Sequence, residues 1–397
     1  MNIFNKIKDK AKRHKERHQA SDHQFVIADS IAFTNLVDWY KIAQHSSVFL
    51  SVKYLAAIEA CSPENTTQKY AIAYKDNLPV VIVACQIAEI TGVNLVHESG
   101  NITDKITKKY KERVLVCGNL VSSGLHGVGM DPDFDPEMAW RIVAEVLYKI
   151  RRMERLSGKI DFVMVKDIKK NLLKPSEVLE RFSYRKIQTD PDMVLDFGKP
   201  LNSFDDYLSG LTSKYRGRIK KIIKTIDQAG LVCEKLTLDE SLDQKLHQLY
   251  VNVESKAATR LATLPVGYFL ALQNALPDSF CCYGIKKEDE LIGFVSIIKD
   301  HQDAVAYYVG INYDVNKKLP IYFRLLQLVI ESAIELKCSK VLFGRTALEP
   351  KASLGAKPIE EFVWARHRVP VVNFMVRKLF RNIPFDIAPE RSVTKKQ

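Results

Sequence analysis

The stretch KVLFGRTALEPKASLGA, residues 340 to 356, decides both the expected fold and the expected site. Its apolar run Val341-Leu342-Phe343 predicts a buried strand, and Gly344 ends that strand. The polar side chains that follow are Arg345, Thr346, Glu349 and Lys351. Polar groups just beyond the end of a buried strand are where open α/β sheets usually bind ligands. The alternative is a loop whose arginine and glutamate only pair with each other.

Length and composition predict a globular protein of two domains. The chain has 397 residues, 46% of them hydrophobic and 27% charged, which is too long for one ordinary core. No apolar run approaches the roughly 18 residues that span a bilayer, and no signal peptide is expected. The seven cysteines form no C-x-x-C pair, so neither a disulfide framework nor a zinc site is expected. We therefore expect a cytoplasmic protein without a metal.

Positive charge is concentrated in three blocks. The net charge is +12, and basic residues gather in residues 1–20, 214–224 and 366–396. Such a balance favours anionic partners, namely a phosphorylated cofactor, RNA or an acidic membrane surface, without choosing among them.

The first 24 residues predict a basic amphipathic helix. Its apolar positions recur at helical spacing, with lysines on the other faces; they are Met1, Ile3, Phe4, Ile7 and Ala11. Such a helix could hold the protein reversibly at the inner face of an anionic membrane. The alternative is a frayed, solvated helix.

An internal repeat organises the rest of the chain. A helix around Tyr54, followed by two extended runs, recurs 214 positions later as a helix around Tyr268 with two runs of its own. Both halves then continue with a strand, a loop, a long helix and a second strand. The offset there is roughly 180, which places an insertion near residues 90–111. This duplication predicts an α/β fold of mixed sheets with helices on their faces.

The segment between the halves, residues 205–230, predicts a helix with an apolar stripe and a basic opposite face. The basic face either contacts phosphate or RNA, or is only solvated.

Three segments carry a family resemblance: SKYRGRIKKIIKTIDQAGL (213–231), YYVGINYDVNKKLPIYFRLLQLVIESAIE (307–335) and FGRTALEPKASLGA (343–356). In these segments the chain resembles the GNAT acyltransferase superfamily, in particular its tandem, Fem-like branch. The resemblance implies two GNAT-like domains packed side by side, at residues 25–197 and 198–375, and a basic C-terminal tail at residues 376–397. It also implies transfer of an acyl or aminoacyl group from a thioester or a charged tRNA to an amine.

Acyl transfer to an amine needs a base for the acceptor, stabilisation of the carbonyl oxyanion and an acid for the leaving thiolate. We expect Glu349 or His126 to be the base and Tyr308 the acid. The residues expected to bind substrate are Arg345, Lys351, Thr346 and Tyr307. A histidine in a glycine loop is equally often structural, and one of two neighbouring strand tyrosines can face the core.

The phosphates of a CoA-type donor usually bind where a glycine loop enters a helix N-terminus. Half one offers Gly124, Gly127 and Gly129, and half two offers Asn316, Lys317 and Lys318. Neither loop reproduces the superfamily's Gln/Arg-x-x-Gly-x-Gly/Ala signature. The three glycines could also make a tight connection without binding phosphate.

The leading hypothesis is an N-acyltransferase with acyl-CoA or acetyl-CoA as donor substrate. Its acceptor would be the amine of an amino acid, a peptide or an amino-lipid, and no covalent intermediate is expected. One alternative is an aminoacyl-tRNA-dependent, Fem-type peptidoglycan peptide transferase, although residues 236–265 leave little room for the helical hairpin that would hold tRNA. Another is a non-catalytic GNAT-fold module that binds anionic lipid or RNA.

Overall fold

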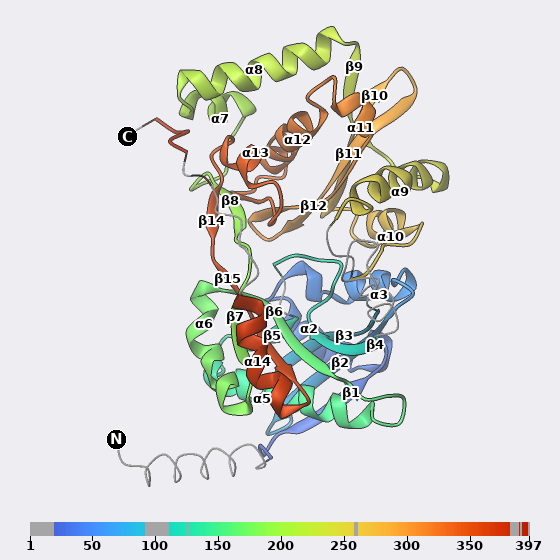
Figure 1. The fold of residues 1–397 in the computed structure, drawn as a ribbon, viewed down its shortest axis with the longest axis vertical. Helices are drawn as coiled ribbons and strands as arrows, with labels where there is room; N and C mark the ends of the chain where they lie inside the picture. Colours follow the sequence, from blue (N-terminus) through green and yellow to red (C-terminus); the bar gives the residue numbers. More distant parts are fainter. Residues whose placement is uncertain are drawn as a thin grey trace.

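The computed structural model describes residues 20–91, 111–124, 127–257, 261–381, 389 and 391–395. Two lobes, each built on one sheet, lie one above the other (Figure 1). The helix predicted for the first 24 residues and the insertion predicted near residues 90–111 lie almost entirely outside the described residues. None of the described helices combines the length and apolar character needed to cross a bilayer.

The first sheet has seven strands in a row and an eighth paired to one of them. In spatial order the row is β1 (Gln24–Ala28), β2 (Thr66–Lys75), β3 (Leu78–Thr91), β4 (Lys111–Cys117), β6 (Phe162–Lys169), β15 (Glu361–His367) and β7 (Arg185–Gln188). Strand β5 (Val128–Met130) pairs with β3. The helices of this lobe are η1 (Ile31–Phe33), α2 (Leu36–Ala43), η2 (Val48–Leu50), α3 (Val52–Ala60), α5 (Pro136–Met153), α6 (Lys170–Ser176), η4 (Glu177–Phe182) and α14 (Pro370–Arg381).

Helix α5 covers one face of this sheet, because its buried stripe, which includes Trp140, packs on the residues of β3, β4 and β6 that point to that side. Helices α2 and α3 cover the opposite face.

The second sheet also has seven strands. Their spatial order is β14 (Lys357–Ile359), β8 (Asp192–Asp196), β13 (Lys340–Leu342), β12 (Asp303–Ile311), β11 (Glu290–Asp300), β10 (Phe280–Lys287) and β9 (Leu231–Leu236). Its helices are α7 (Phe204–Gly210), α8 (Ser213–Gln228), α9 (Glu240–Glu254), α10 (Tyr268–Ala275), α11 (Tyr313–Asn316), α12 (Ile321–Glu335) and α13 (Leu348–Ala352). Helix α12 covers one face, and α9 with α10 covers the other.

The predicted repeat is confirmed by the strand pairing. Strands β2, β3, β4 and β6 pair antiparallel, antiparallel and parallel, and β10, β11, β12 and β13 pair in the same way. Helices α3 and α10 precede the equivalent hairpins, and α5 and α12 make the equivalent crossovers. One apolar core includes side chains of α3 and of α10, so the two lobes share a core.

Each half contributes one strand to the sheet of the other half. Strand β8 belongs to half one by sequence but pairs with β13, and β15 belongs to half two but pairs with β6 and β7. The predicted division at residues 197 and 198 therefore does not separate one sheet from the other. The predicted start of the C-terminal tail, at residue 376, also falls inside α14.

The segment predicted as one helix, residues 205–230, forms two. Helix α7 ends before Leu211 and α8 begins after Thr212, because these two residues pair with the C-terminal segment instead. Leu211 makes a β-bridge with Thr394, and Thr212 N–H donates to the carbonyl oxygen of Val393 at 2.9 Å.

Candidate functional site between the two lobes

A loop of half one leaves the first sheet at the end of β4; its described residues, 118–124 and 127, are called here the crossing loop. Gly118 N–H donates to the carbonyl oxygen of Ala84 at 2.9 Å, and Ala84 N–H donates to the carbonyl oxygen of Gly127 at 2.8 Å. The chain thus departs and returns at one point of β3, before continuing as β5. The equivalent strand of half two, β12, makes no such loop and has only a bulge at Tyr307.

Gly127 makes this close return feasible. Its φ is +75°, and a Cβ atom there would lie 2.3 Å from the carbonyl oxygen of Ala84. Gly124 also has a positive φ, of +77°, but a Cβ atom there would meet no atom within 4 Å.

Two neighbouring residues of β6 hold the crossing loop in place. Lys166 Nζ donates to the carbonyl oxygens of Asn119, at 2.8 Å, and Ser122, and forms an ion pair with Asp167 at 2.8 Å. Asp167 Oδ2 also accepts from Gly124 N–H at 2.9 Å. Lys166 and Asp167 are both buried, and Asp167 adopts a left-handed backbone with φ of +56°.

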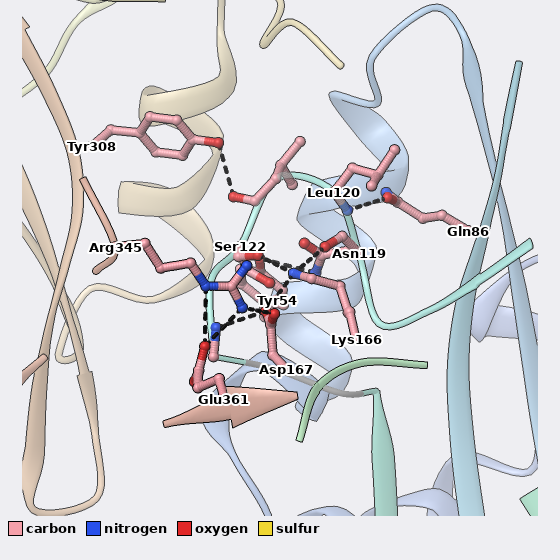
Figure 2. A network of polar contacts seen from close by, with 12 residues as sticks. Tyr54, Gln86, Asn119, Leu120, Ser122, Lys166, Asp167, Tyr308, Arg345 and Glu361 are labelled. Carbon is pink, nitrogen blue, oxygen red and sulfur yellow. Dashed lines mark hydrogen bonds and ion pairs between the residues drawn. The ribbon is translucent and has the colours of Figure 1, made fainter. Parts of the chain in front are cut away.

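Arg345 reaches this cluster from the other half of the chain (Figure 2). Its Nη2 contacts Asp167 Oδ1 and lies 2.7 Å from Glu361 Oε2, and its Nε donates to the same Glu361 oxygen at 3.1 Å. Among the described residues its Nη1 makes no hydrogen bond, and its side chain stays 26% exposed. One edge of the guanidinium is therefore held by protein, and the other is free to meet a ligand.

The two carboxyl groups that hold Arg345 respond differently to burial. Burial opposes ionisation of Asp167, but Lys166 and Arg345 outweigh it and lower the pKa of Asp167. Burial, together with the charge of Asp167, raises the pKa of Glu361 to about 7, against the effect of Arg345. Glu361 Oε1 is buried and has no hydrogen-bond partner among the described residues.

Three tyrosines join the two lobes beside this cluster. Tyr307 of β12 hydrogen-bonds through its hydroxyl to those of Tyr54 and Tyr268, at 3.0 and 2.5 Å. Tyr54 and Tyr268 are the equivalent residues of α3 and α10. Burial raises the pKa of Tyr54 to about 12 and that of Tyr307 well above its ordinary value, so these phenols stay protonated near neutral pH.

Tyr308, the expected acid, also points to the crossing loop. Its hydroxyl donates to the carbonyl oxygen of Val121 at 2.9 Å (Figure 2). Tyr307 and Tyr308 thus both face the junction between the lobes, whereas alternation along a regular strand would turn one of them away. The bulge at Tyr307 removes that alternation.

A cavity of about 320 Å³ lies against the cluster and is called here the interlobe cavity. Its walls are mainly apolar and come from β6, β15, the end of β7 and the segment before α10; they include Phe162, Met164, Ile187, Leu261, Val363 and Ala365. Its polar lining is Ser122, Ser123, Lys166, Asp167, Thr189 and Arg345. A second cavity, of about 530 Å³, is lined by four basic side chains and four carboxylates, and Glu361 belongs to that lining.

Three of the expected site residues lie near Arg345 in sequence but not in the interlobe cavity. Glu349 is exposed on α13 and forms an ion pair with Arg391 at 2.5 Å. Lys351 is buried, donates to the carbonyl oxygen of Gly344 at 3.0 Å, and has a pKa lowered by burial to about 8. Thr346 is exposed. The alternative pairing of Arg345 with Glu349 is not observed.

The two loops expected to bind phosphate do not lead into helix N-termini in the way that was expected. The glycines of half one do not enter α5 directly, because an acidic turn with Asp131, Asp133 and Asp135 precedes that helix. In half two Asn316 Oδ1 accepts from Tyr322 N–H at 2.9 Å and so occupies a donor at the start of α12. Lys317 pairs with Asp314, and Lys318 is exposed. His126 lies outside the described residues.

Lys166, Asp167 and Glu361 were not among the site residues predicted from the sequence. Asp167 stands 178 positions before Arg345, close to the repeat offset of the second strands, so the repeat itself contains the signal for this pair. Glu361 carries no such signal, because its place depends on β15 joining the first sheet.

No family profile and no curated protein matches the sequence. Solved structures do match the fold. FemX is 10% identical, with 90% of this chain and 100% of that chain covered at a TM-score of 0.56. The C-terminal domain of a candidate lysylphosphatidylglycerol synthetase from Agrobacterium fabrum is 9% identical, with 87% and 95% covered at a TM-score of 0.50. A tandem GNAT protein from the clavulanic acid pathway is 10% identical, with 88% and 99% covered at a TM-score of 0.49.

The tandem GNAT-like fold is confirmed. FemX matches along its whole length and covers 90% of this chain, so the likeness extends over both lobes. At this identity the likeness concerns the fold alone.

Proposed function

We propose that the protein is an N-acyltransferase that moves an acyl group from an acyl-thioester, such as acyl-CoA or acetyl-CoA, to the amine of an amino acid, a peptide or an amino-lipid. The observation that carries this proposal is Arg345. Two buried carboxyl groups hold it, its Nη1 makes no hydrogen bond among the described residues, and its side chain lines a largely apolar cavity between the lobes.

In this reaction the amine nitrogen attacks the carbonyl carbon of the thioester, the carbon–sulfur bond breaks, and the proton lost by the amine balances the thiolate that leaves. Negative charge develops on the carbonyl oxygen before the sulfur departs. A donor that is already oriented, in a site with little water, stabilises that charge more than water does. Arg345 Nη1 fits this role because Asp167 and Glu361 fix the guanidinium before any substrate binds.

The walls of the interlobe cavity support an acyl group as its occupant. Phe162, Met164 and Val363 supply apolar surface, and the charged side chains Lys166, Asp167 and Arg345 are paired in one cluster. This arrangement would bury the apolar part of a substrate and leave its carbonyl beside Arg345. Glu349, Lys351 and Thr346 face elsewhere, so we do not include them in the proposed site.

An aminoacyl-tRNA donor is the second candidate. Helix α8 exposes Lys220, Lys221 and Lys224, and no ion pair among the described residues neutralises them. Such a face suits a phosphate backbone. Against tRNA, the described chain between β9 and α10 holds one helix of 15 residues, α9, where the Fem-type resemblance implies a helical hairpin.

The donor can be identified by transfer assays with acetyl-CoA, long-chain acyl-CoA and aminoacyl-tRNA, each with a panel of amines and detection of the amide product by mass spectrometry. We expect a thioester to react only when an amine is present. Arg345→Lys should reduce the rate roughly 10²- to 10³-fold, because lysine lacks the planar fork that the carboxyl groups of Asp167 and Glu361 orient.

Arg324→Lys is the matched control. Arg324 is a buried arginine of α12 that pairs with Glu331 through both of its terminal nitrogens and lies outside the interlobe cavity. Its replacement should leave transfer unchanged. A rate that falls equally in both variants, or transfer that only charged tRNA supports, would overturn the proposed site or the proposed donor, respectively.

A further inference from the structure

We propose that helix α14 docks the protein on an anionic membrane surface. The helix presents large apolar side chains to solvent over its first two turns. Val371 is 70% exposed, Phe374 69%, Met375 45% and Val372 37%. Single exposed apolar side chains are ordinary, but four within five positions of one helix make a continuous patch, and such patches mark interaction surfaces.

The opposite side of α14 is anchored firmly to the first lobe. Val376 is buried against Val363 and Ala365 of β15. Asn373 is buried as well, where its Oδ1 accepts from His367 N–H at 2.9 Å and its Nδ2 donates to the carbonyl oxygen of Ser183 at 3.0 Å. The helix therefore cannot turn its exposed side chains inward without losing these contacts.

The charge around the helix favours an anionic membrane as the occupant. Between residues 362 and 385 the sequence has no carboxylate, and its five cations are Arg366, Arg368, Arg377, Lys378 and Arg381. Arg155 and Lys159, both exposed, lie in the connection that ends at Asp161, the ion-pair partner of Arg368. Apolar side chains flanked by cations fit the interface of an anionic bilayer, where the chains enter the acyl boundary and the cations meet phosphate.

A second copy of this chain is a poorer occupant. A two-fold contact through α14 would bring together two copies of a segment that has five cations and no carboxylate, and like charges across an interface oppose association. The docking proposal does not depend on the acyl-transfer proposal, and its test has no activity readout.

The test is co-sedimentation of the full chain with vesicles of phosphatidylcholine, either pure or mixed equally with phosphatidylglycerol. We expect binding to the anionic vesicles that weakens with salt. The double variant Val371→Ser/Phe374→Ser should lose about tenfold or more of its vesicle affinity, because burial of each large apolar side chain contributes on the order of a tenfold change.

The matched control is Phe33→Ser/Val37→Ser. These residues, at the end of η1 and on α2, are 77% and 68% exposed, so the control removes a similar apolar area from a surface outside α14. It should bind vesicles as the unmodified chain does, and so should a chain without residues 1–19. Equal loss in both double variants, or binding abolished by removal of residues 1–19 alone, would overturn the proposal. A change of oligomeric state in the α14 variant without any vesicle binding would assign the patch to a second copy instead.

Discussion

Arg345 and its partners show how burial assigns different protonation behaviour to neighbouring groups. Asp167 keeps its charge because two cations face it, whereas Glu361 shares only Arg345 and lies close to Asp167. The arginine of this cluster could be predicted, since it follows a recognisable strand. Its carboxylate partners could not be assigned from their own neighbourhoods, because each depends on a contact distant in sequence.

The raised pKa of Glu361 predicts a specific dependence of stability on pH. The folded chain holds a proton on Glu361 up to about pH 7, and the unfolded chain releases it near the ordinary value of 4.5. Stability should therefore fall as pH rises between these values, by up to about 3 kcal/mol. Glu361→Gln should lack this contribution, so urea unfolding should show the variant gaining stability relative to the unmodified chain from pH 5 to pH 8.

Glu360→Gln is the control for this measurement. Glu360 is the exposed neighbour of Glu361 and pairs with Lys170 at 2.6 Å. Its replacement should leave the pH profile parallel to that of the unmodified chain. A parallel profile for Glu361→Gln too would show that Glu361 ionises normally in the folded protein.

The two glycines of the crossing loop offer a second prediction at this scale. Gly124→Ala and Gly127→Ala both place a side chain at positive φ, at a cost of about 1–2 kcal/mol each. Gly127→Ala should lose a further ~1–3 kcal/mol, because its Cβ would overlap the carbonyl oxygen of Ala84. Urea unfolding of both variants measures the difference. Equal losses would mean that the loop returns to β3 less closely than described.

At the scale of elements, the repeat could be read from the sequence and the strand exchange could not. The helix, the hairpin and the crossover recur in the same order, so their order and pairing follow from local pattern. The sequences of β8 and β15 carry no periodic signal that distinguishes one sheet from the other. Without these two strands β13 and β6 would be edge strands with unpaired backbone groups, and no segment adjacent in sequence pairs with that edge.

The exchange predicts that half one does not fold alone. Residues 20–197 lack β15, which lies between β6 and β7. This strand carries Trp364, whose side chain is fully buried in the core between the first sheet and α5. We expect this fragment to show no cooperative thermal transition by circular dichroism. Mixing it with separately expressed residues 198–397 should restore one. A cooperative transition in the fragment alone would contradict the proposed dependence on β15.

At the scale of the whole molecule, the site lies where the lobes meet. Tyr54 and Tyr268 occupy equivalent positions of the two halves, and the hydroxyl of each hydrogen-bonds to that of Tyr307. Asp167 and Arg345 are 178 positions apart, close to the repeat offset of the second strands. Candidate residues on each half could be predicted from the sequence, but the packing of one half on the other decides which of them come together. For this reason Arg345 remains in the proposed site, whereas Glu349, only four positions later, does not.

The most direct test of the central claim is to fill the interlobe cavity and measure acyl transfer. Ser123 is exposed on the crossing loop and lines the cavity, so Ser123→Trp should occupy it at little cost to the fold. Ser241→Trp, at an exposed position on α9 outside that cavity, is the control. We predict that Ser123→Trp lowers the rate of amide formation roughly a hundredfold with an unchanged melting temperature, and that Ser241→Trp keeps the full rate. An equal, undiminished rate in both variants would contradict the claim that transfer takes place between the lobes.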